Sequence, residues 1–306
     1  MSRILVIGSS NTDMVIRVPA LPRPGETVLG GEFAINGGGK GANQALAAAR
    51  AGGAVTFLAR VGDDDFGRRA LDGLGAAGVD TGPCIVDADS PSGVAQILVD
   101  AGGENCIAVA PGANARLAPG DLAAAGEHFL AGNLVLLQLE TPLATVAAAL
   151  GRARDAGCRT VLNPAPAQPL PGELLALVDI LTPNESEAEH LTGIAVSDDA
   201  SAAAAAEAMH RQGVATVLLT RGARGVFLSE AGGGQRAFPA FAVTAVDSTA
   251  AGDVFNGCLL AALAEGRDLG EAIPFAQAGA ALSVRRPGAQ DSVPGRSAIE
   301  AFLRTA

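Results

Sequence analysis

The sequence has no tryptophan and no tyrosine, only four cysteines, and fewer basic than acidic residues. The cysteines stand far apart and form no CxxC pair, which argues against a disulfide framework or a zinc site and predicts a cytoplasmic location. No apolar stretch reaches about 18 residues, and the residues after Met1 lack a signal-peptide pattern, so we expect no membrane partner. The 21 basic and 32 acidic residues give a net charge of -11. This charge argues against nucleic-acid binding, which needs a positive surface.

The 306 residues are enough for one large or two small domains. Hydrophobic residues make up 49% of the chain and charged residues 17%, so it can bury a sizeable core and is not expected to be disordered. Because no charged or serine-rich linker divides the sequence, we expect a single domain over residues 1–306.

Most of the chain alternates between short apolar runs and longer helical segments. The run from Leu134 to Leu139 is typical of a parallel strand that is buried on both faces. Such alternation predicts an α/β fold with a doubly wound, mostly parallel sheet flanked by helices. We expect strands at 4–8, 55–58, 134–139, 159–162, 178–182 and 216–220, a closing β meander at 226–228 and 237–241, and helices at 42–51, 66–77, 120–130, 142–155, 171–177, 184–191, 198–212, 252–265 and 268–284.

Two further patches have β character with no helix between their pieces. They cover residues 14–36 and 93–109, and the second contains Asp100-Ala-Gly-Gly, which is a hairpin signal. We expect the two patches to form a small sheet outside the main fold.

Lys40 is the only lysine in the chain, and every other cationic residue is arginine. It lies in the glycine-rich segment Gly37–Asn43, where backbone can approach a ligand closely. The segment is not a Walker A loop, because Ala34 and Gly41 stand where that motif needs glycine and a hydroxyl residue. An ordinary flexible turn and a chance position are the simpler interpretations. A compact ammonium differs from a planar guanidinium, however, so we favour a polar small-molecule site that needs lysine.

Three other segments each allow a functional and a purely structural interpretation. Ala250–Asp253 precedes an apolar helix, so its amides could bind an anion, or Asp253 could merely stabilise the helix dipole. Asn184 and Glu187 have the spacing of a helix capping box. Thr220–Gly225 could be no more than a hairpin turn. The three histidines have no metal-ligand spacing, and no Ser–His–Asp set is evident.

Taken together, these segments resemble a known family. Gly38–Gln44, Thr182–Glu187 and Asp247–Gly257 are similar to the three signatures of the PfkB-type carbohydrate kinases, in the same order, and the resemblance covers essentially the whole chain. Further segments resemble the members of the family that act on ribose. These are Gly8–Asp13, Pro24–Thr27, Gln138–Glu140, Asn163–Pro166 and Gly288–Gln290.

The resemblance implies an enzyme that uses ATP to phosphorylate D-ribose at O5, giving D-ribose 5-phosphate. It implies Mg²⁺ and K⁺ as cofactors, and a homodimer formed through a β-sheet lid at about 12–38 and 92–110. A related kinase acting on another sugar or on a nucleoside is the main alternative. A non-catalytic sugar-binding regulator is an alternative of a different class, and the intact Ala250–Asp253 segment argues against it.

Residue roles also follow from the resemblance. Asp253 corresponds to the catalytic base, and the amides of Ala250, Ala251 and Gly252 to an anion hole. The sugar site comprises Asn11, Thr12, Asp13, Gly39, Lys40, Gly41, Ala42, Asn43, Glu140 and Asp253. The ATP site comprises Asn184, Thr220, Arg221, Gly222, Ala223, Arg224, Gly225, Gly252, Asp253 and Gln277. Glu187 corresponds to a residue that holds Mg²⁺ through water, and the K⁺ site comprises Asp247, Thr249, Ser283, Arg286, Gly288 and Ser292.

Overall fold

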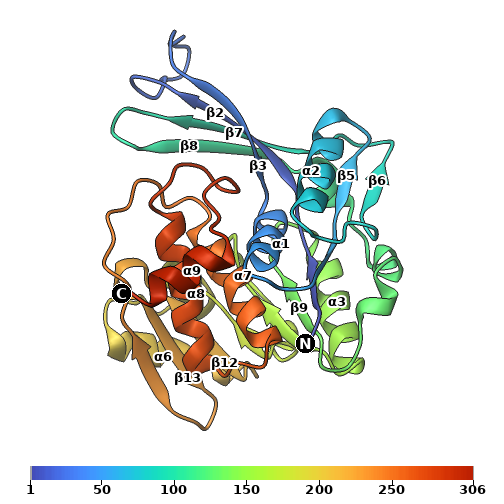
Figure 1. The fold of residues 1–306 in the computed structure, drawn as a ribbon, viewed down its shortest axis with the longest axis vertical. Coiled ribbons are helices and arrows are strands. Elements are labelled where there is room, and N and C mark those ends of the chain that lie inside the picture. The colour runs from blue at the N-terminus through green and yellow to red at the C-terminus, as the bar shows by residue number, and fades with distance from the viewer. Residues whose placement is uncertain (1, 306) are drawn as a thin grey trace.

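A computed structural model describes residues 2–305, and its centre is an 8-stranded sheet (Figure 1). The strand order is β14-β13-β12-β11-β10-β9-β1-β4, and the pairs from β4 to β12 are parallel, whereas β12, β13 and β14 pair antiparallel. The strands are β1 (Ile4–Ile7), β4 (Val55–Leu58), β9 (Leu134–Leu137), β10 (Arg159–Leu162), β11 (Ile180–Leu181), β12 (Thr216–Thr220), β13 (Val226–Glu230) and β14 (Gln235–Phe238). The predicted α/β class is confirmed, and its physical basis is the burial of these apolar strands on both faces.

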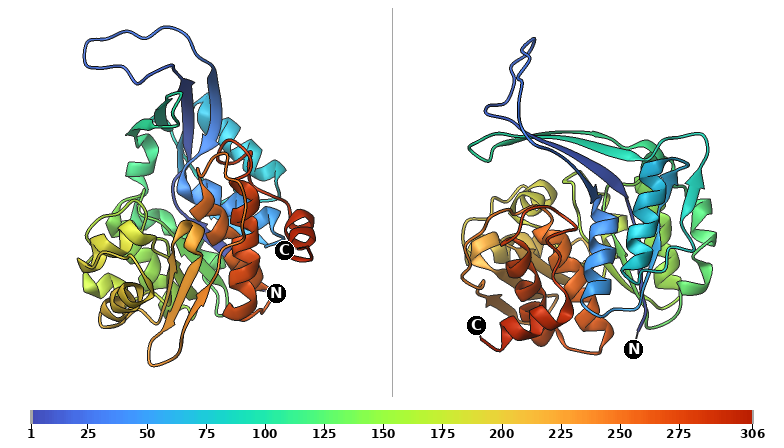
Figure 2. Two further views of the ribbon diagram at one scale, coloured as in Figure 1. Left: turned by 90° about the vertical axis from the view of Figure 1, so that its left-hand side faces the viewer. Right: turned by 45° about the horizontal axis from the view of Figure 1, so that its top comes forward.

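Helices cover both faces of this sheet, as Figure 2 (left) shows from the edge. Alternate strand residues feed two separate cores, with Val6 in one and Ile7 in the other. The first core contains residues of α1 (Lys40–Arg50), α2 (Asp65–Ala76), α7 (Ala251–Ala264), α8 (Leu269–Ser283) and α9 (Arg296–Leu303). The second contains residues of α3 (Leu143–Asp155), α4 (Gly172–Leu175), α5 (Glu185–Thr192) and α6 (Asp199–His210).

Helices α1 and α7 pack unusually close together. A Cβ atom at Gly257 would lie 2.5 Å from the Cβ of Ala47 and 2.6 Å from the carbonyl oxygen of Gln44. Only glycine permits this approach without displacing α1. The contact brings the first turns of the two helices together, and both predicted functional segments begin there.

A second, 4-stranded sheet stands beside the main one, in the order β3-β2-β7-β8. Its strands are β2 (Asn11–Arg17), β3 (Phe33–Gly38), β7 (Gly93–Val99) and β8 (Asn105–Ala110), so the two β patches pair with each other as expected. The sheet projects from the body, and the β2–β3 connection extends farthest (Figure 2). Exposed apolar side chains lie on it, among them Phe33, Ile35, Ile107 and Val109.

Several predicted elements were wrong or missed. The helix expected at 120–130 is instead a series of short 3₁₀ turns, Pro119–Ala123 and Gly126–His128, and Gly126 interrupts the alanine-rich run. The helix expected at 171–177 is a single turn, α4. Helix α9 and the small parallel pair β5 (Arg60–Gly62) and β6 (Ile85–Asp87) were not predicted. Within residues 2–305, none of the helices is both long and apolar enough to cross a membrane.

Candidate active site

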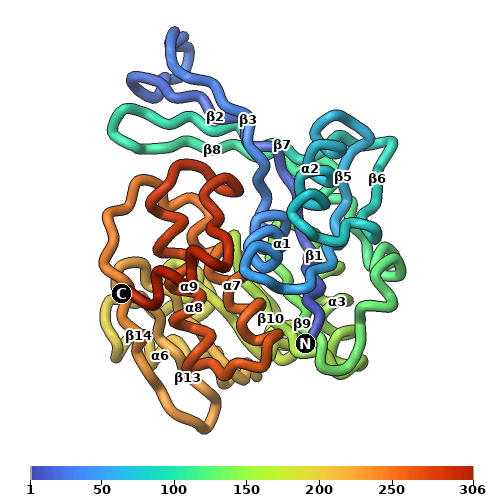
Figure 3. Tube along the Cα trace, in the orientation of Figure 1, coloured from blue at the N-terminus to red at the C-terminus, as the bar shows by residue number. Residues whose placement is uncertain are grey.

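The predicted functional segments converge where the parallel strands end and helices α1 and α7 begin. β2 follows shortly after β1, and β3 leads directly into α1, so the base of the second sheet adjoins this point (Figure 3). Ligands of open α/β sheets bind at the carboxyl ends of the strands. The side chains that gather at this edge of the sheet therefore form the candidate site.

Asp13 lies on β2 with its carboxylate against the neighbouring strand. A Cβ atom at Gly38 would lie 2.2 Å from Asp13 Oδ1, so the carboxylate occupies the space that a side chain at position 38 would take. The pKa of Asp13 is raised to about 6, chiefly by burial and then by the nearby carboxylates of Glu140 and Asp253, against the lowering effect of Lys40. Asp13 is thus a carboxylate held partly out of water.

Lys40 does not lie in a loop but is the first residue of α1. Its backbone amide donates to Glu140 Oε2 over 3.0 Å, and Ser9 Oγ donates to the same oxygen over 2.5 Å. Glu140 therefore caps α1 from a distant part of the chain, since the N-cap Gly39 has no side chain to do so. Burial lowers the pKa of Lys40, but the surrounding carboxylates outweigh this and raise the pKa overall. The carboxylates are those of Asp253, Glu140, Glu187 and Asp13.

Asp253 is in the first turn of α7 and is 6% exposed. Asn43 Nδ2 donates to its Oδ2 over 3.0 Å, and Gln44 Nε2 donates to its Oδ1 over 2.8 Å. Burial raises the pKa of Asp253, whereas Lys40 and these two amides lower it, and the net direction is upward. The carboxylate is buried but well supplied with hydrogen-bond donors.

The backbone before Asp253 has an unusual shape. Ala250 has φ 59° and ψ 12°, and among residues 2–305 it is the single non-glycine residue with positive φ. A left-handed residue at a helix N-terminus turns successive N–H groups toward one point, which is the geometry of an anion-binding nest. Gly252 is exposed, and its missing Cβ would meet no other atom within 4 Å. The predicted anion-hole amide of Ala251, however, donates to the carbonyl of Ser248 over 3.2 Å. The site thus combines a carboxylate with the amides of Ala250 and Gly252.

The other predicted sugar-site residues surround these groups. Asn11 and Thr12 are buried at the start of β2, and Asn11 Oδ1 accepts a hydrogen bond from Asn114 Nδ2 over 2.8 Å. Asn43 Oδ1 is buried and has no partner among the described residues, so it is an acceptor left free for a ligand. Gly39, Gly41 and Ala42 form the turn into α1 and its first residues.

Asn184 and Glu187 form the capping box predicted for α5. Asn184 Oδ1 accepts from the amide of Glu187 over 2.8 Å, and Glu187 Oε2 accepts from the amide of Asn184 over 2.8 Å. Glu187 is nevertheless only 7% exposed, and this burial raises its pKa, against the effect of its bond to the Asn184 amide and the charge of Lys40. A cap on a surface helix needs no such burial. Its nearness to Lys40 and Asp253 links the cap to the rest of the site.

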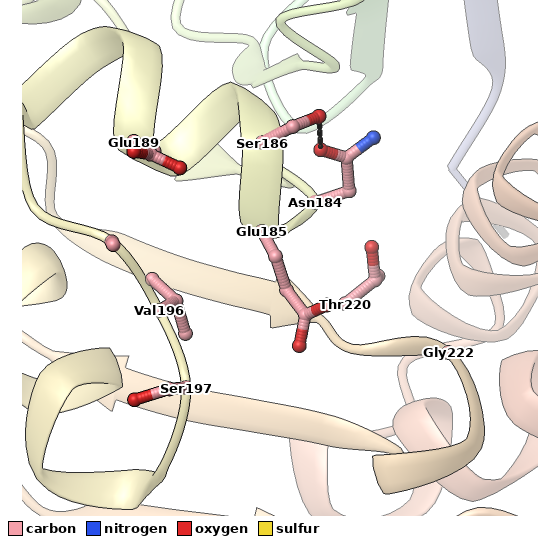
Figure 4. A pocket seen from close by; sticks show the side chains of 9 residues that line it. Asn184, Glu185, Ser186, Glu189, Val196, Ser197, Thr220 and Gly222 are labelled. Carbon is pink, nitrogen blue, oxygen red and sulfur yellow. Dashed lines mark hydrogen bonds between the residues drawn. The ribbon is translucent and has the colours of Figure 1, made fainter.

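A cavity of about 500 Å³ lies beside this cap (Figure 4). Its walls come from the start of α5, the end of β12 and the segment between α5 and α6. The lining residues are Asn184, Glu185, Ser186, Glu189, Ala195, Val196, Ser197, Thr220 and Gly222. Asn184 and Thr220, both expected in a nucleotide site, therefore meet at its edge.

Among the remaining predicted ATP-site residues, some are exposed and others have side chains that already bond elsewhere in the protein. Thr220 ends β12, and Gly222–Arg224 form a 3₁₀ turn before β13, on which Gly222 and Ala223 are exposed. Arg221 points away, with its guanidinium buried, paired with Asp199 and stacked over Phe227. Arg224 pairs with Glu185. Gln277 Nε2 is already bonded to the carbonyls of Phe238 and Pro239, each over 3.2 Å.

The predicted cation-site residues lie on two loops near α7 and α8. Asp247 joins the loops, because its Oδ1 accepts from the amide of Thr249 and its Oδ2 from the amide of Gly288, each over 2.9 Å. Burial would raise the pKa of Asp247, but these bonds outweigh it and lower the pKa overall. Ser283 is buried at the end of α8, where its hydroxyl donates to the carbonyl of Ala280, and Ser292 is buried on the second loop, where its hydroxyl donates to the carbonyl of Ala289. Arg286 is exposed.

Sequence reasoning missed four polar residues in this region, Ser9, Gln44, Gln138 and Asn163. Gln44 bonds directly to Asp253, and Gln138 and Asn163 bond to Gln44. Signals for them were present, because all four lie in segments that resemble the family, and Gln138 also interrupts an apolar run. Their partners are far away along the chain, so no local pattern could identify the contacts they make.

Comparison with known proteins agrees with this arrangement. The sequence profile described as pfkB family carbohydrate kinase matches residues 1–296. The chain belongs to the PfkB family of carbohydrate kinases. A curated ribokinase of Haemophilus influenzae is 45% identical over 99% of both chains, and a deoxyribokinase of Salmonella typhi is 37% identical over 98% of both. The solved structure of an Arabidopsis thaliana ribokinase complexed with ribose and ATP superposes with a TM-score of 0.92 at 31% identity and covers 100% of both chains.

Membership of this family makes the chain a carbohydrate kinase. The match to the Arabidopsis structure covers the whole chain and therefore includes both sheets. The cluster of Asp13, Lys40, Glu140 and Asp253 brings together residues of the second sheet and of the main body.

Proposed function

We propose that this PfkB-family kinase transfers the γ-phosphoryl group of ATP to O5 of D-ribose. The observation that carries the proposal is Asp253, a buried carboxylate in the first turn of α7 directly after Ala250, Ala251 and Gly252. In this reaction the O5–P bond forms while the bond from the γ-phosphorus to the oxygen of the leaving ADP breaks. The hydroxyl proton of O5 goes to Asp253.

Asp253 suits the role of a general base for three reasons. Its pKa is raised by burial, which makes it a stronger base than a solvated aspartate. Two amide donors hold its carboxylate in one orientation. The amides of Ala250 and Gly252 would then face the region where negative charge develops on the transferring group, and such preorganised donors stabilise that charge strongly.

The sugar would be held by the second sheet and by the start of α1. Asp13 has a carboxylate that makes no hydrogen bond among the residues described and can accept from two adjacent hydroxyls. Asn43 Oδ1 and the Asn11 side chain supply further polar groups, and Lys40 supplies the ammonium. Glu140 accepts a hydrogen bond from the Lys40 amide and adds a third charged group, beside Asp13 and Lys40, to the sugar site.

We place ATP between the cavity at Asn184 and the amides before Asp253. Thr220, Gly222, Ala223 and Gly225 would supply backbone for the nucleotide, since the Arg221 side chain is committed to Asp199. Gln277 would meet the base through its carbonyl oxygen, because its amide nitrogen is already bonded.

Mg²⁺ fits this site as a companion of the phosphates. No cluster of three or more acidic, histidine or cysteine ligands occurs within residues 2–305, and Mg²⁺ commonly keeps several waters while bound to substrate phosphates. Glu187, buried beside Lys40 and Asp253, would hold such a hydrated ion through water. When bound, Mg²⁺ neutralises charge on the phosphates.

K⁺ fits the loops that Asp247 joins, where Thr249, Ser283, Arg286, Gly288 and Ser292 supply oxygen atoms. The lowered pKa of Asp247 keeps a negative charge between the loops. When bound, a monovalent cation there fixes the backbone leading to Ala250. This ion would take no part in the proton or phosphoryl transfer.

The second sheet, residues 12–38 and 92–110, would act as a lid and as a dimer interface. Residues 1–306 would then form a single domain that carries this sheet as an appendage. Strand register places Asp13 and Val109 on one face, which would cover the sugar, and Phe33 and Ile35 on the other, where they are 59% and 45% exposed. We infer that a second copy covers that outer face. Ile35→Lys should then convert a dimer to a monomer in analytical ultracentrifugation. The four unpaired thiols suit the cytoplasm, where we place the enzyme.

A coupled assay of ADP release with ribose, 2-deoxyribose, fructose and adenosine tests the substrate. We expect the highest kcat/KM with ribose, and a product phosphorylated at O5 by phosphorus NMR. Preference for 2-deoxyribose would instead support the second candidate, favoured by the identity to the Salmonella deoxyribokinase. Sugar binding in calorimetry without any turnover would contradict both and support a sugar-binding regulator.

A further inference from the structure

A chain of buried polar side chains lies directly behind Asp253, and only Gln44 among them entered the chemistry proposed above, as one of the two donors to Asp253. We call it the amide relay. Its members are Gln44, Gln138, Asn163, Thr182 and Asn256, whose exposed fractions are 0%, 1%, 7%, 1% and 1%. Burying uncompensated amides in a core is unfavourable by roughly 1–3 kcal/mol each on the scale of protein mutations. Such a concentration of polar groups in the centre of a sheet needs an explanation.

The relay begins at the carboxyl ends of neighbouring strands. Gln138 follows β9, Asn163 follows β10 and Thr182 follows β11, and these strands are adjacent in the sheet. Each side chain therefore projects from a rigid strand end rather than from a free loop. A group bonded to several of them is fixed relative to the whole sheet.

Gln44 connects these strand ends to Asp253. Its Oε1 accepts from Gln138 Nε2 over 2.6 Å, while its Nε2 donates both to Asn163 Oδ1 over 3.0 Å and to Asp253 Oδ1 over 2.8 Å. The reversed amide would set its oxygen against the carboxylate, which is repulsive. The bond from Gln138 therefore keeps the donor of Gln44 turned toward Asp253.

A second arm of the relay reaches the proposed anion hole. Asn163 Nδ2 donates to the carbonyl of Thr182 over 3.1 Å, and Thr182 Oγ1 donates to Asn256 Oδ1 over 2.7 Å. Asn256 Nδ2 then donates to the carbonyl of Gly252 over 2.9 Å. One network thus holds both the carboxylate of Asp253 and the peptide just before it.

Resting on the proposed function, we propose that Gln44 is a positioning residue for phosphoryl transfer. It holds the Asp253 carboxylate, through Oδ1, in the orientation that accepts the hydroxyl proton. It does not touch the sugar or the phosphates. Gln44 lies on the same helix as Lys40 and Asn43, so α1 both binds the sugar and orients the base.

The test compares Gln44→Met with Asn133→Leu. Methionine preserves the volume of Gln44 and removes the donor. Asn133 is a matched control, because it is 8% exposed and bonds to Arg3 and His128. It lies just before β9, at the amino ends of the strands, whereas the candidate site lies at their carboxyl ends. Both variants lose a buried amide, so both should lose stability. We expect kcat to fall about 10- to 100-fold in Gln44→Met alone, with KM for the sugar changing less than about threefold, because only the transition-state interaction is lost.

The pH dependence of kcat gives a readout that a structural role would not move. The Gln44 donor favours the ionised carboxylate, so its removal should shift the acid limb of the profile to higher pH. Lys40, Glu140, Asp13 and Glu187 face the same carboxylate and are unchanged in both variants. Gln44→Glu keeps the shape of the side chain and adds a negative charge, so it should shift the acid limb further in the same direction. It also provides the test if the methionine variant fails to fold.

The idea is overturned if kcat and the acid limb of a folded Gln44 variant match those of the wild type. It is equally overturned if Asn133→Leu loses kcat to the same extent, since the effect would then come from general destabilisation. The assays use whichever sugar the wild-type chain phosphorylates. A preference for a sugar other than ribose would therefore refute the proposed substrate and leave the result for Gln44 decisive.

Discussion

Asp13 offers a direct test of the charge arrangement, because the folded site disfavours its ionised form before any ligand binds. Its pKa is raised from 3.8 to about 6, chiefly by burial and then by Glu140 and Asp253. A carboxyl group whose pKa is raised in the folded state binds its proton more tightly there than in the unfolded chain. The free energy of unfolding therefore falls as the pH rises from about 4 to about 6, and the full penalty remains above that range.

Asp13→Asn removes this penalty. A shift of about 2 pKa units corresponds to about 3 kcal/mol, which is an upper bound because Asp13 is half-buried and coupled to the neighbouring acids. After allowance for solvent screening we expect a gain of about 1–2 kcal/mol at pH 8. This corresponds to a rise in Tm of roughly 2–6 °C for a chain of this size. At pH 4 the wild-type carboxyl is largely protonated, and the difference should nearly vanish.

The same substitution should weaken sugar binding. A carboxylate that accepts two hydroxyl hydrogen bonds contributes about 1.5–3 kcal/mol for each charged bond, so the loss of charge should raise KM for ribose about 100-fold. The assays are thermal unfolding at pH 4 and pH 8, and steady-state kinetics at pH 8. Asp72→Asn is the control, since Asp72 is exposed on α2 and its replacement should change stability by less than about 0.5 kcal/mol. An Asp13→Asn variant less stable than the wild type at pH 8 would refute the electrostatic argument.

Three further predictions concern the other charged groups. Asp253→Asn should lower kcat by about 10²–10⁴-fold while calorimetry shows nearly normal ribose binding, and near-normal kcat would exclude it as the base. Lys40→Arg should lower kcat/KM for ribose about tenfold or more, about 1.4 kcal/mol, because a planar fork does not fit among the flanking glycines. Lys40→Met should lower kcat/KM further, because it also removes the charge. An arginine variant with wild-type kcat/KM would show that the site has no specific need for lysine. K⁺ should activate and Na⁺ should do so poorly, because a set of oxygen ligands can favour the larger ion, and equal rates in K⁺-free buffer would count against the site joined by Asp247.

The sequence could predict those parts of the molecule whose physical cause is local. The capping box of α5 was predicted from the spacing of Asn184 and Glu187, and the structure confirms both bonds. Apolar runs predicted the parallel strands, since burial on both faces leaves a continuous pattern. The helix expected at 120–130 was wrong because alanine content suggested a helix, while Gly126 interrupts the alanine-rich run with an unfavourable residue. Helix α9 is short and follows a proline, so its pattern was too weak to detect.

The contacts among the polar groups behind the candidate site could not be predicted in this way, because they depend on how the fold brings distant segments together. Glu140 caps α1 although 100 residues separate it from Lys40, and Gln44 meets Asp253 across 209 residues. No spacing rule connects such pairs. A weaker signal was present, however: Gln138 ends an apolar strand, where a buried amide is unfavourable unless a partner exists. In a parallel α/β sheet that position is also the edge where ligands bind. Polar residues that directly follow buried parallel strands are therefore expected to bond to one another and to the site, even when the chain separates them widely.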